Sequence, residues 1–280
     1  MKRFFLLPVL ALLSITSSAQ LFWIVSGNGL EKKSYIFGTM HDAPYSMIDE
    51  VSGLNDAIMK CDITIGEVDR NDQSGQELNE SDLMAPVDST LDKLLSPEDY
   101  RIVEETVNKR LESTGVSLNE LRILKPSVIS ILSMDTDLSE LGSDTHRKSF
   151  DIEILNRAAA AGHYTMGFET IAEHHDWLIN APLIDQARWL VSKCKNYSNI
   201  EGFDEVYINQ DATVQFESRT PDEGYREIMV YQRNSNWADK LDRLMPKYSC
   251  LVCVGAAHLS GEKGLLQLLR DRGYTVEPVH

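Results

Sequence analysis

Short apolar runs that end in glycine or in turn residues mark the predicted strands of this chain. Residues 21–27 (LFWIVSG) and 33–41 (KSYIFGTMH) flank a Gly-Asn-Gly turn and predict two neighbouring strands. Further strands are predicted at 61–69 (CDITIGEVD), 164–170 (YTMGFET), 248–255 (YSCLVCVG) and 274–279 (YTVEPV). Strands near both ends of a chain with helices between them are typical of the α/β class.

Helical spacing of apolar residues fills most of the chain between these strands. The clearest helix begins with Ser96 as N-cap and Pro97 at the first helical position, and Gly115 ends it. Other helices are predicted at 48–60, 118–124, 128–134, 150–161 and 261–272, and in the stretch 182–246 with starts at Pro182 and Pro221. Residues 70–90 are polar and predict a loop.

The first nineteen residues predict a signal peptide. Lys2 and Arg3 precede an apolar stretch too short to span a membrane comfortably, and small residues stand at 17 and 19. We expect an exported protein, periplasmic or secreted, that begins at Gln20; an uncleaved membrane anchor is the alternative. No later segment is apolar enough to cross a membrane. Residues 20–280 then form one α/β domain: a central mixed sheet, flanking helices and a helical insertion around 182–246.

Composition narrows the classes of partner. The chain is 42% hydrophobic and 25% charged, as in ordinary globular proteins, and its formal net charge is −16. Such a charge disfavours nucleic acid as a partner, and an anionic membrane surface as well, because like charges repel.

The four cysteines offer little evidence of a metal or redox centre. Cys250 and Cys253 form a CxxC pattern inside a predicted strand, where residues three apart point to opposite faces. We therefore expect buried thiols rather than a zinc or redox pair. Export would permit disulfides, and a contact of Cys61 with Cys250 or Cys253 stays open.

Polar side chains follow four of the predicted strands: His41, Glu67, Glu169 and His258. His41 and His258 share a strand–Gly–x–x–His pattern, in which glycine allows an unusual dihedral angle and a close approach of the backbone to a ligand. Two imidazoles and two carboxylates suit a divalent-metal site or acid/base catalysis. Alternatively, each histidine bonds a loop carbonyl, and the glutamates are solvated or pair with Arg233.

Five segments in this order, LFWIVSGNGLEKKSYIFGTMH, GEVD, GFET, YQRNSNW and VGAAHLSGEKGLLQLLRDRGYTVEPV, resemble the TraB/GumN family. The family is related to the TIKI metalloproteases and more distantly to erythromycin esterase-like proteins. The resemblance implies an α/β hydrolase-like fold with two GxxH histidines at one site. In the TIKI relatives the activity is metal-dependent peptide cleavage, and in the esterase relatives a GxxH histidine is proposed to activate water.

The resemblance assigns roles position by position. His41 and His258 match the two GxxH histidines, and Glu67 matches the acidic residue after the next strand. Arg233 and Asn234 match an R-N pair before a tryptophan, here Trp237. Supporting positions are Gly38, Thr39, Asn234, Gly255 and Gly261.

Three departures from the family pattern concern the substrate more than the chemistry. Phe168 replaces leucine in G-L-E-T, and Gln232 replaces glutamate before the R-N pair. His174 and His175 follow Glu173 where Glu-Gln is usual; we expect both on the surface, and a supplementary ligand is the alternative.

The expected function is hydrolysis of a peptide or ester bond with a divalent ion, Mn²⁺, Co²⁺ or Zn²⁺, held by His41, Glu67 and His258, with Glu169 as a further candidate. Arg233 would steady an oxyanion or substrate carboxylate, or form a buried salt bridge. The H-E-x-x-H motif of zinc proteases is absent. The alternatives are a metal-free His/Glu hydrolase and a non-catalytic ligand-binding protein on the same fold.

Overall fold

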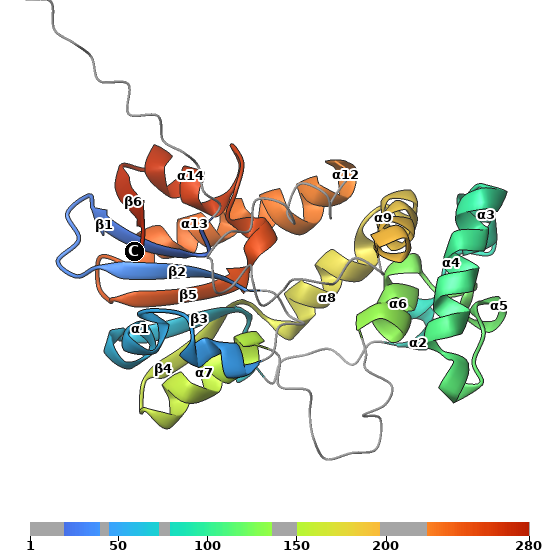
Figure 1. Cartoon of the computed structure of the whole chain (residues 1–280). Coiled ribbons are helices and arrows are strands. Elements are labelled where there is room, and N and C mark those ends of the chain that lie inside the picture. Colours follow the sequence, from blue (N-terminus) through green and yellow to red (C-terminus); the bar gives the residue numbers. More distant parts are fainter. Residues whose placement is uncertain (1–19, 40–44, 73–78, 136–149, 197–222, 280) are drawn as a thin grey trace, which may run out of the picture.

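A computed structural model of the protein describes residues 20–39, 45–72, 79–135, 150–196 and 223–279 (Figure 1). The strands are β1 (Phe22–Gly27), β2 (Ser34–Thr39), β3 (Ile63–Val68), β4 (Tyr164–Glu169), β5 (Cys250–Gly255) and β6 (Tyr274–Pro278). The α-helices are α1 (Leu54–Lys60), α2 (Glu80–Leu83), α3 (Leu91–Leu94), α4 (Pro97–Arg110), α5 (Leu118–Leu121), α6 (Pro126–Ser130), α7 (Phe150–Ala160), α8 (Ile171–Asn180), α9 (Leu183–Asn196), α12 (Glu223–Arg226), α13 (Arg233–Leu244) and α14 (Leu265–Asp271). Short 3₁₀ and π-helical turns are η1 (Tyr45–Asp49), η2 (Glu112–Thr114), η3 (Ile131–Asp135), η5 (Glu227–Gln232) and η6 (Ala256–His258).

The six strands form one mixed sheet in the order β4-β3-β5-β2-β1-β6. The four strands from β4 to β2 run parallel, whereas β1 is antiparallel to both β2 and β6. Parallel strands end at the same edge of the sheet, so the residues that follow β2, β3, β4 and β5 leave from one side. The sheet thereby confirms the predicted α/β class with a mixed sheet and flanking helices.

Each face of the sheet has its own apolar core. One face packs against η1, α1 and α7, with Phe37 and Phe150 stacked at 5.8 Å between ring centroids. The other face packs against α13 and α14, where Trp237 is fully buried. The helices therefore cover both faces and form a three-layer α/β/α arrangement (Figure 1).

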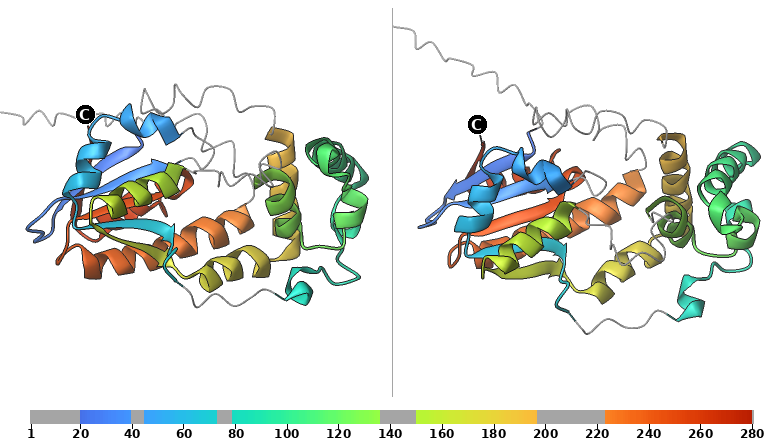
Figure 2. Two further views of the ribbon diagram at one scale, coloured as in Figure 1. Left: turned by 90° about the horizontal axis from the view of Figure 1, so that it is seen from below. Right: turned by 60° about the horizontal axis from the view of Figure 1, so that its bottom comes forward.

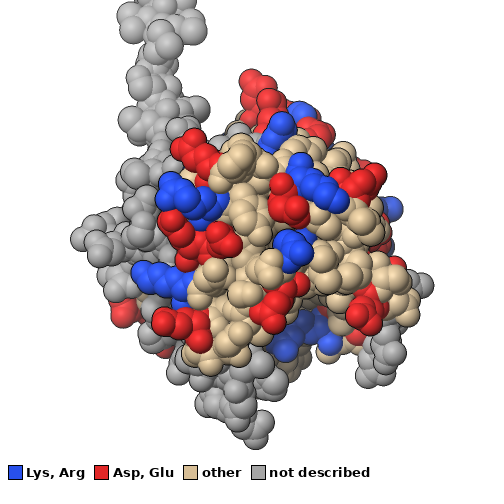
Figure 3. All heavy atoms as spheres, turned by 90° about the vertical axis from the view of Figure 1, so that its right-hand side faces the viewer, with Lys and Arg blue, Asp and Glu red and all other residues tan. Residues whose placement is uncertain are grey.

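Five of the remaining helices, α3, α4, α5, α6 and α9, form what we call the helical lobe. Its core includes Val103 and Val107 of α4 and Leu190 of α9. Helix α8 runs between the sheet and this lobe (Figure 2), packing against β4 at one end and α6 at the other. The buried Gln186 fixes this junction, because its side chain accepts from Ser127 N–H and donates to the Ala181 carbonyl. On the outward face of the lobe, acidic and basic side chains are interspersed (Figure 3).

Local sequence signals account for much of this arrangement. The turn between β1 and β2 places Gly27, Asn28 and Gly29 at positive φ, which these residues tolerate. Ser96 caps α4 by accepting from Asp99 N–H at 3.1 Å, as predicted. Gly162, at φ 84, follows α7.

Several predicted boundaries are wrong, and three of them have a clear local cause. The helix predicted at 48–60 is split into η1 and α1, because Gly53 adopts a left-handed conformation with φ 80. The helix predicted at 261–272 begins only at Leu265, because Gly264 has extended dihedrals and serves as its N-cap. Within the polar loop predicted at 70–90, a capping box between Asn79 and Asp82 supports the short helix α2.

All four cysteines are buried free thiols, as predicted for Cys250 and Cys253. Cys250 packs in the core on the α13 side and Cys253 in the core on the α7 side, so the CxxC residues do point to opposite faces. Burial raises the pKa of the Cys61 thiol to about 11, which keeps it protonated at neutral pH.

Two paired glycines should tolerate a methyl group very differently. A Cβ at Gly167 of β4 would lie 1.9 Å from the Asp69 backbone nitrogen, whereas a Cβ at its partner Gly66 would meet only the flexible end of Leu155, at 3.0 Å. We expect Gly167→Ala to lower the free energy of unfolding by about 3 kcal/mol or more, and Gly66→Ala by about 1 kcal/mol. Urea denaturation measures both, and equal losses would contradict this reading of the close approach.

Candidate active site

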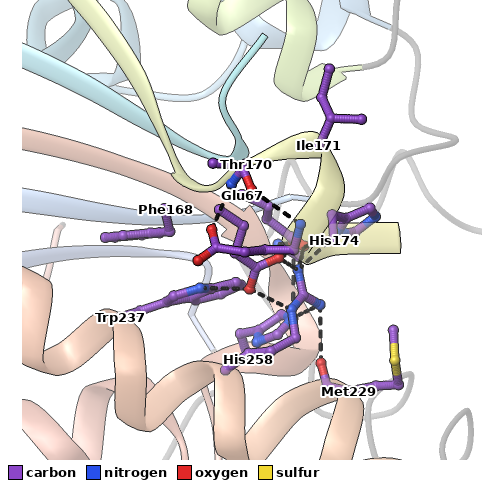
Figure 4. A network of polar contacts seen from close by, with 12 residues as sticks. Glu67, Phe168, Thr170, Ile171, His174, Met229, Trp237 and His258 are labelled. Carbon is purple, nitrogen blue, oxygen red and sulfur yellow. Dashed lines mark hydrogen bonds and ion pairs between the residues drawn. The ribbon is translucent and has the colours of Figure 1, made fainter. Parts of the chain in front are cut away.

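Polar side chains converge where the parallel strands end (Figure 4). Glu67 lies near the end of β3 and Glu169 is the last residue of β4, so the paired strands deliver both carboxylates to the same edge. Arg233 begins α13, and His258 closes the turn η6 that follows β5. Residues far apart in the sequence thus meet in one buried cluster (Figure 4).

Arg233 is the centre of this cluster. Its side chain donates from Nε to Glu169 Oε1 at 2.8 Å, and from Nη2 to Glu169 Oε2 at 3.0 Å and Glu67 Oε2 at 2.7 Å. Nη1 donates to the Met229 carbonyl at 3.0 Å and lies 3.4 Å from His258 Nε2. A guanidinium has five N–H donors, and oxygen atoms accept from four of them. The fifth faces His258 Nε2 at 3.4 Å, which is longer than a normal hydrogen bond.

The π-helical turn η5 before α13 provides one of these acceptors. The Arg233 backbone N–H donates to the Val230 carbonyl, three residues back, instead of to the Met229 carbonyl as in a regular α-helix. The Met229 carbonyl accepts from the Arg233 side chain instead. A change of helical register at a functional site is a common use of π-helical turns.

Glu169 is held almost entirely by protein groups. It is 5% exposed, and its Oε1 also accepts from Trp237 Nε1 at 2.9 Å, while its Oε2 lies 3.3 Å from His174 Nδ1. Burial alone would raise the pKa of this carboxyl group, but the hydrogen bonds from His174 and Arg233 outweigh burial and lower the pKa below its ordinary value of 4.5. Glu169 is therefore an ionised partner of Arg233.

Glu67 faces both a backbone donor and His258. Its Oε1 accepts from Gly255 N–H at 2.7 Å and lies 3.9 Å from His258 Nε2. Its Oε2 accepts from Arg233. With Glu67 and Glu169 ionised against Arg233, these three side chains carry one net negative charge, which favours the approach of a cation.

His258 is fixed on several sides. Its Nδ1 lies 2.7 Å from Asn234 Oδ1, and its ring centroid lies 4.4 Å from that of Trp237. The turn that carries it rests on β2: a Cβ at Gly38 would lie 2.6 Å from Leu259 Cδ1 and 3.1 Å from Ala256 Cβ. Neither GxxH glycine has positive φ, so the expected unusual dihedral angle is wrong, and the need at Gly38 is for close packing.

The structure places the other predicted positions as follows. Thr39, the last residue of β2, pairs with Gly255 of β5, so β2 leads to the same edge of the sheet. His41, two residues further on, lies outside the described residues. Asn234 is buried beside His258, and Gly261, at φ 89, lies in the turn beyond it.

Sequence reasoning missed two members of the cluster. His174 was expected on the surface as part of an exposed helix start, but it is half-buried against Glu169 and 3.5 Å from Arg233 Nη2. Trp237 was noted only as part of a motif, yet it bonds Glu169, stacks on Phe168 at 5.1 Å and lies 4.7 Å from the Arg233 guanidinium carbon. The capping box of α8, between Thr170 and Glu173, fixes the direction in which α8 leaves β4 and so the position of His174 on that helix.

Comparison with known protein families places nearly the whole described chain in one of them. Residues 21–278 match the TraB/PrgY/gumN family, which is nearly the whole chain. The chain belongs to the TraB/PrgY/gumN family. The erythromycin esterase and TIKI relationships stated above go beyond that match.

Curated relatives add similarity over a short stretch. The chain is 50% identical over 44 residues to "Uncharacterized protein YbaP" of Escherichia coli (strain K12) and to the protein of that name from Shigella flexneri. Each match spans 16% of this chain and 16% of the relative. No solved structure matches. None of the helices described in this TraB/PrgY/gumN family member has the length and apolarity needed to cross a membrane.

The donor set fits a divalent ion only in part. Glu67 Oε1 and His258 Nε2, 3.9 Å apart, lie within the span that one ion about 2.0–2.2 Å from each donor can bridge. Both oxygens of Glu169 already accept hydrogen bonds from Arg233. Among the described residues no three His, Cys, Asp or Glu side chains are grouped as a metal site, and the predicted ligand His41 is not among those residues.

The depressed pKa of Glu169 predicts how stability depends on pH. A carboxyl group whose pKa is lower in the folded protein than in the unfolded chain stabilises the fold above the unfolded value, and this stability is lost as pH falls through the folded value. At neutral pH we expect Glu169→Gln to lower the free energy of unfolding by about 3–5 kcal/mol, because it breaks a buried ion pair. The gap to wild type should narrow below about pH 4.5.

Urea denaturation of both proteins, from neutral pH down to about pH 3, measures this gap. The control is Glu173→Gln, which changes an exposed carboxylate on α8 and should cost about 1 kcal/mol or less. A gap between wild type and Glu169→Gln that stays constant throughout would contradict an ionised Glu169 held by Arg233.

Proposed function

We propose that this protein hydrolyses a peptide or ester bond at the cluster around Glu67 and His258. The observation that carries the proposal is the 3.9 Å approach of Glu67 Oε1 to His258 Nε2 at the carboxyl edge of the sheet. An imidazole nitrogen and a carboxylate at this distance can share one water molecule or one ion between them. The family assignment supports the proposal, and the substrate class is part of what is proposed.

His258 and Glu67 would divide the work at the water. His258 Nε2 takes a proton from the water as it attacks the carbonyl carbon and later returns the proton to the leaving group. Glu67 orients the water and stabilises the positive imidazolium that forms. Because Glu67 is itself held by Gly255 N–H and Arg233, its carboxylate stays in position throughout.

Arg233 takes a positioning role in this proposal instead of stabilising an oxyanion. Four of its five donors are engaged by oxygen atoms of the protein, and its side chain is only 4% exposed. The buried salt bridge, one of the three roles that the sequence allows for Arg233, agrees best with this geometry. Arg233 keeps Glu67 and Glu169 ionised and fixes the distance between β3 and α13.

Glu67 and His258 would supply two ligands to a divalent ion at the proposed site, with His41 as the further ligand expected from the family resemblance. When bound there, such an ion would lower the pKa of a coordinated water and polarise the carbonyl. The net negative charge of the Arg233, Glu67 and Glu169 group supports cation binding. Export to the periplasm or the cell exterior is part of the same proposal and rests on residues 1–19.

Loss of either histidine tests whether His41 and His258 act on one site. We expect His41→Ala and His258→Ala each to lose most bound divalent metal and nearly all hydrolysis, and the double variant to lose little more, because residues that act as a unit are strongly non-additive. The measurements are bound Mn²⁺, Co²⁺ and Zn²⁺ per chain and turnover of peptide and ester libraries. His163→Ala is the control, since His163 lies just before the amino end of β4, at the opposite edge of the sheet.

The same measurements separate the alternatives. Turnover with no bound metal and no effect of chelator would favour a metal-free His/Glu hydrolase. Protein that turns over neither library would favour a ligand-binding protein on this fold. Small, independent effects of the two histidine substitutions would contradict a shared site.

A further inference from the structure

The orientation of the Asn234 side chain is fixed by the backbone around it. Asn234 is fully buried, and its Nδ2 donates to the His258 carbonyl at 3.1 Å and to the Lys263 carbonyl at 2.9 Å. The flipped amide would set Oδ1 against two carbonyl oxygens, so this orientation is the one that the protein can satisfy. Oδ1 therefore faces His258 Nδ1 at 2.7 Å, and because Oδ1 can only accept, Nδ1 must carry a proton.

The opposite side of the imidazole leads to the same assignment. His258 Nε2 lies 3.4 Å from Arg233 Nη1, and a guanidinium nitrogen only donates. A proton on Nε2 would lie beside this donor, which is nearer to Nε2 than the acceptor Glu67 Oε1 at 3.9 Å. Two independent neighbours, Asn234 and Arg233, thus select the neutral tautomer with its proton on Nδ1.

We propose that Asn234 is a positioning residue that holds His258 in the Nδ1–H tautomer and so makes Nε2 the reactive nitrogen. Nε2 is the nitrogen that faces Glu67 Oε1 across 3.9 Å. The inference rests on the proposed function only for what Nε2 then does. In general, the hydrogen bond made by one imidazole nitrogen decides which proton transfer or metal contact the other can make.

The proposal explains why Asn234 is placed where it is. Asn234 is the second residue of α13, directly after Arg233. One turn of helix therefore carries the two polar groups that face the imidazole nitrogens. Its two donor bonds reach the carbonyls on either side of the turn that follows His258. The amide thus fixes the turn and the tautomer at once.

Two substitutions at this position separate the tautomer from the structural role. Asn234→Asp and Asn234→Leu both lose the two bonds to carbonyls, but only aspartate keeps an acceptor for Nδ1–H. Long-range ¹H–¹⁵N NMR spectra of the chelator-treated full chain at about pH 8.5, two units above the ordinary imidazole pKa, read the tautomer directly. His258→Gln identifies the His258 signals among those of the seven histidines.

We expect the Nδ1–H tautomer in wild type and in Asn234→Asp, and a large Nε2–H population in Asn234→Leu. Zn²⁺ affinity should fall about 10–100-fold in Asn234→Leu and much less in Asn234→Asp. A wild-type His258 with its proton on Nε2 overturns the inference even if Asn234→Leu does not fold. An unchanged tautomer in folded Asn234→Leu overturns it as well, because the role of Asn234 would then be only structural.

The outcome for the proposed function is read separately. Wild-type protein with the expected tautomer but no Zn²⁺ binding and no turnover would count against the hydrolase proposal. The assignment of Asn234 as the residue that sets the tautomer would still be supported by the NMR result.

Discussion

A permanent positive charge inside the protein organises this site. Arg233 is 3% exposed, and its guanidinium stays protonated at any physiological pH, so its charge and its five donors must be satisfied by other protein groups. Two glutamates exceed this charge by one, the Met229 carbonyl accepts a further hydrogen bond, and His258 Nε2 faces the remaining N–H. Because β3 and β4 run parallel, both carboxylates lie at one edge of the sheet, where Arg233 can pair with them.

This constraint also links the packing of α13 to the polar cluster. Trp237, one turn along α13 from Arg233, fills the core on that face of the sheet and donates to Glu169 at the same time. Packing of α13 against the sheet therefore fixes the polar cluster and the apolar core together. A change that loosens this helix would move Arg233 and Asn234 as one body, and with them the partners of Glu67 and His258.

The amino-acid sequence predicts the sheet better than it predicts the contacts of the site. Apolar runs bounded by turn residues locate all six strands, and side chains at strand ends meet because parallel strands share an edge. Helix boundaries failed where single glycines, Gly53 and Gly264, adopt conformations that the apolar pattern does not reveal. The prediction that His174 is exposed failed for another reason. Local spacing indicates an exposed helix start, whereas the side chain is buried by Arg233, 59 residues further along the chain.

The π-helical turn η5 shows why such a site cannot be derived from local patterns alone. Nothing in the spacing of residues 227–232 predicts a change of helical register, yet this change leaves the Met229 carbonyl to the Arg233 side chain. The buried ion pairs of Arg233 with Glu67 and Glu169 thus join the end of this turn to β3 and β4, which lie far from it in the sequence.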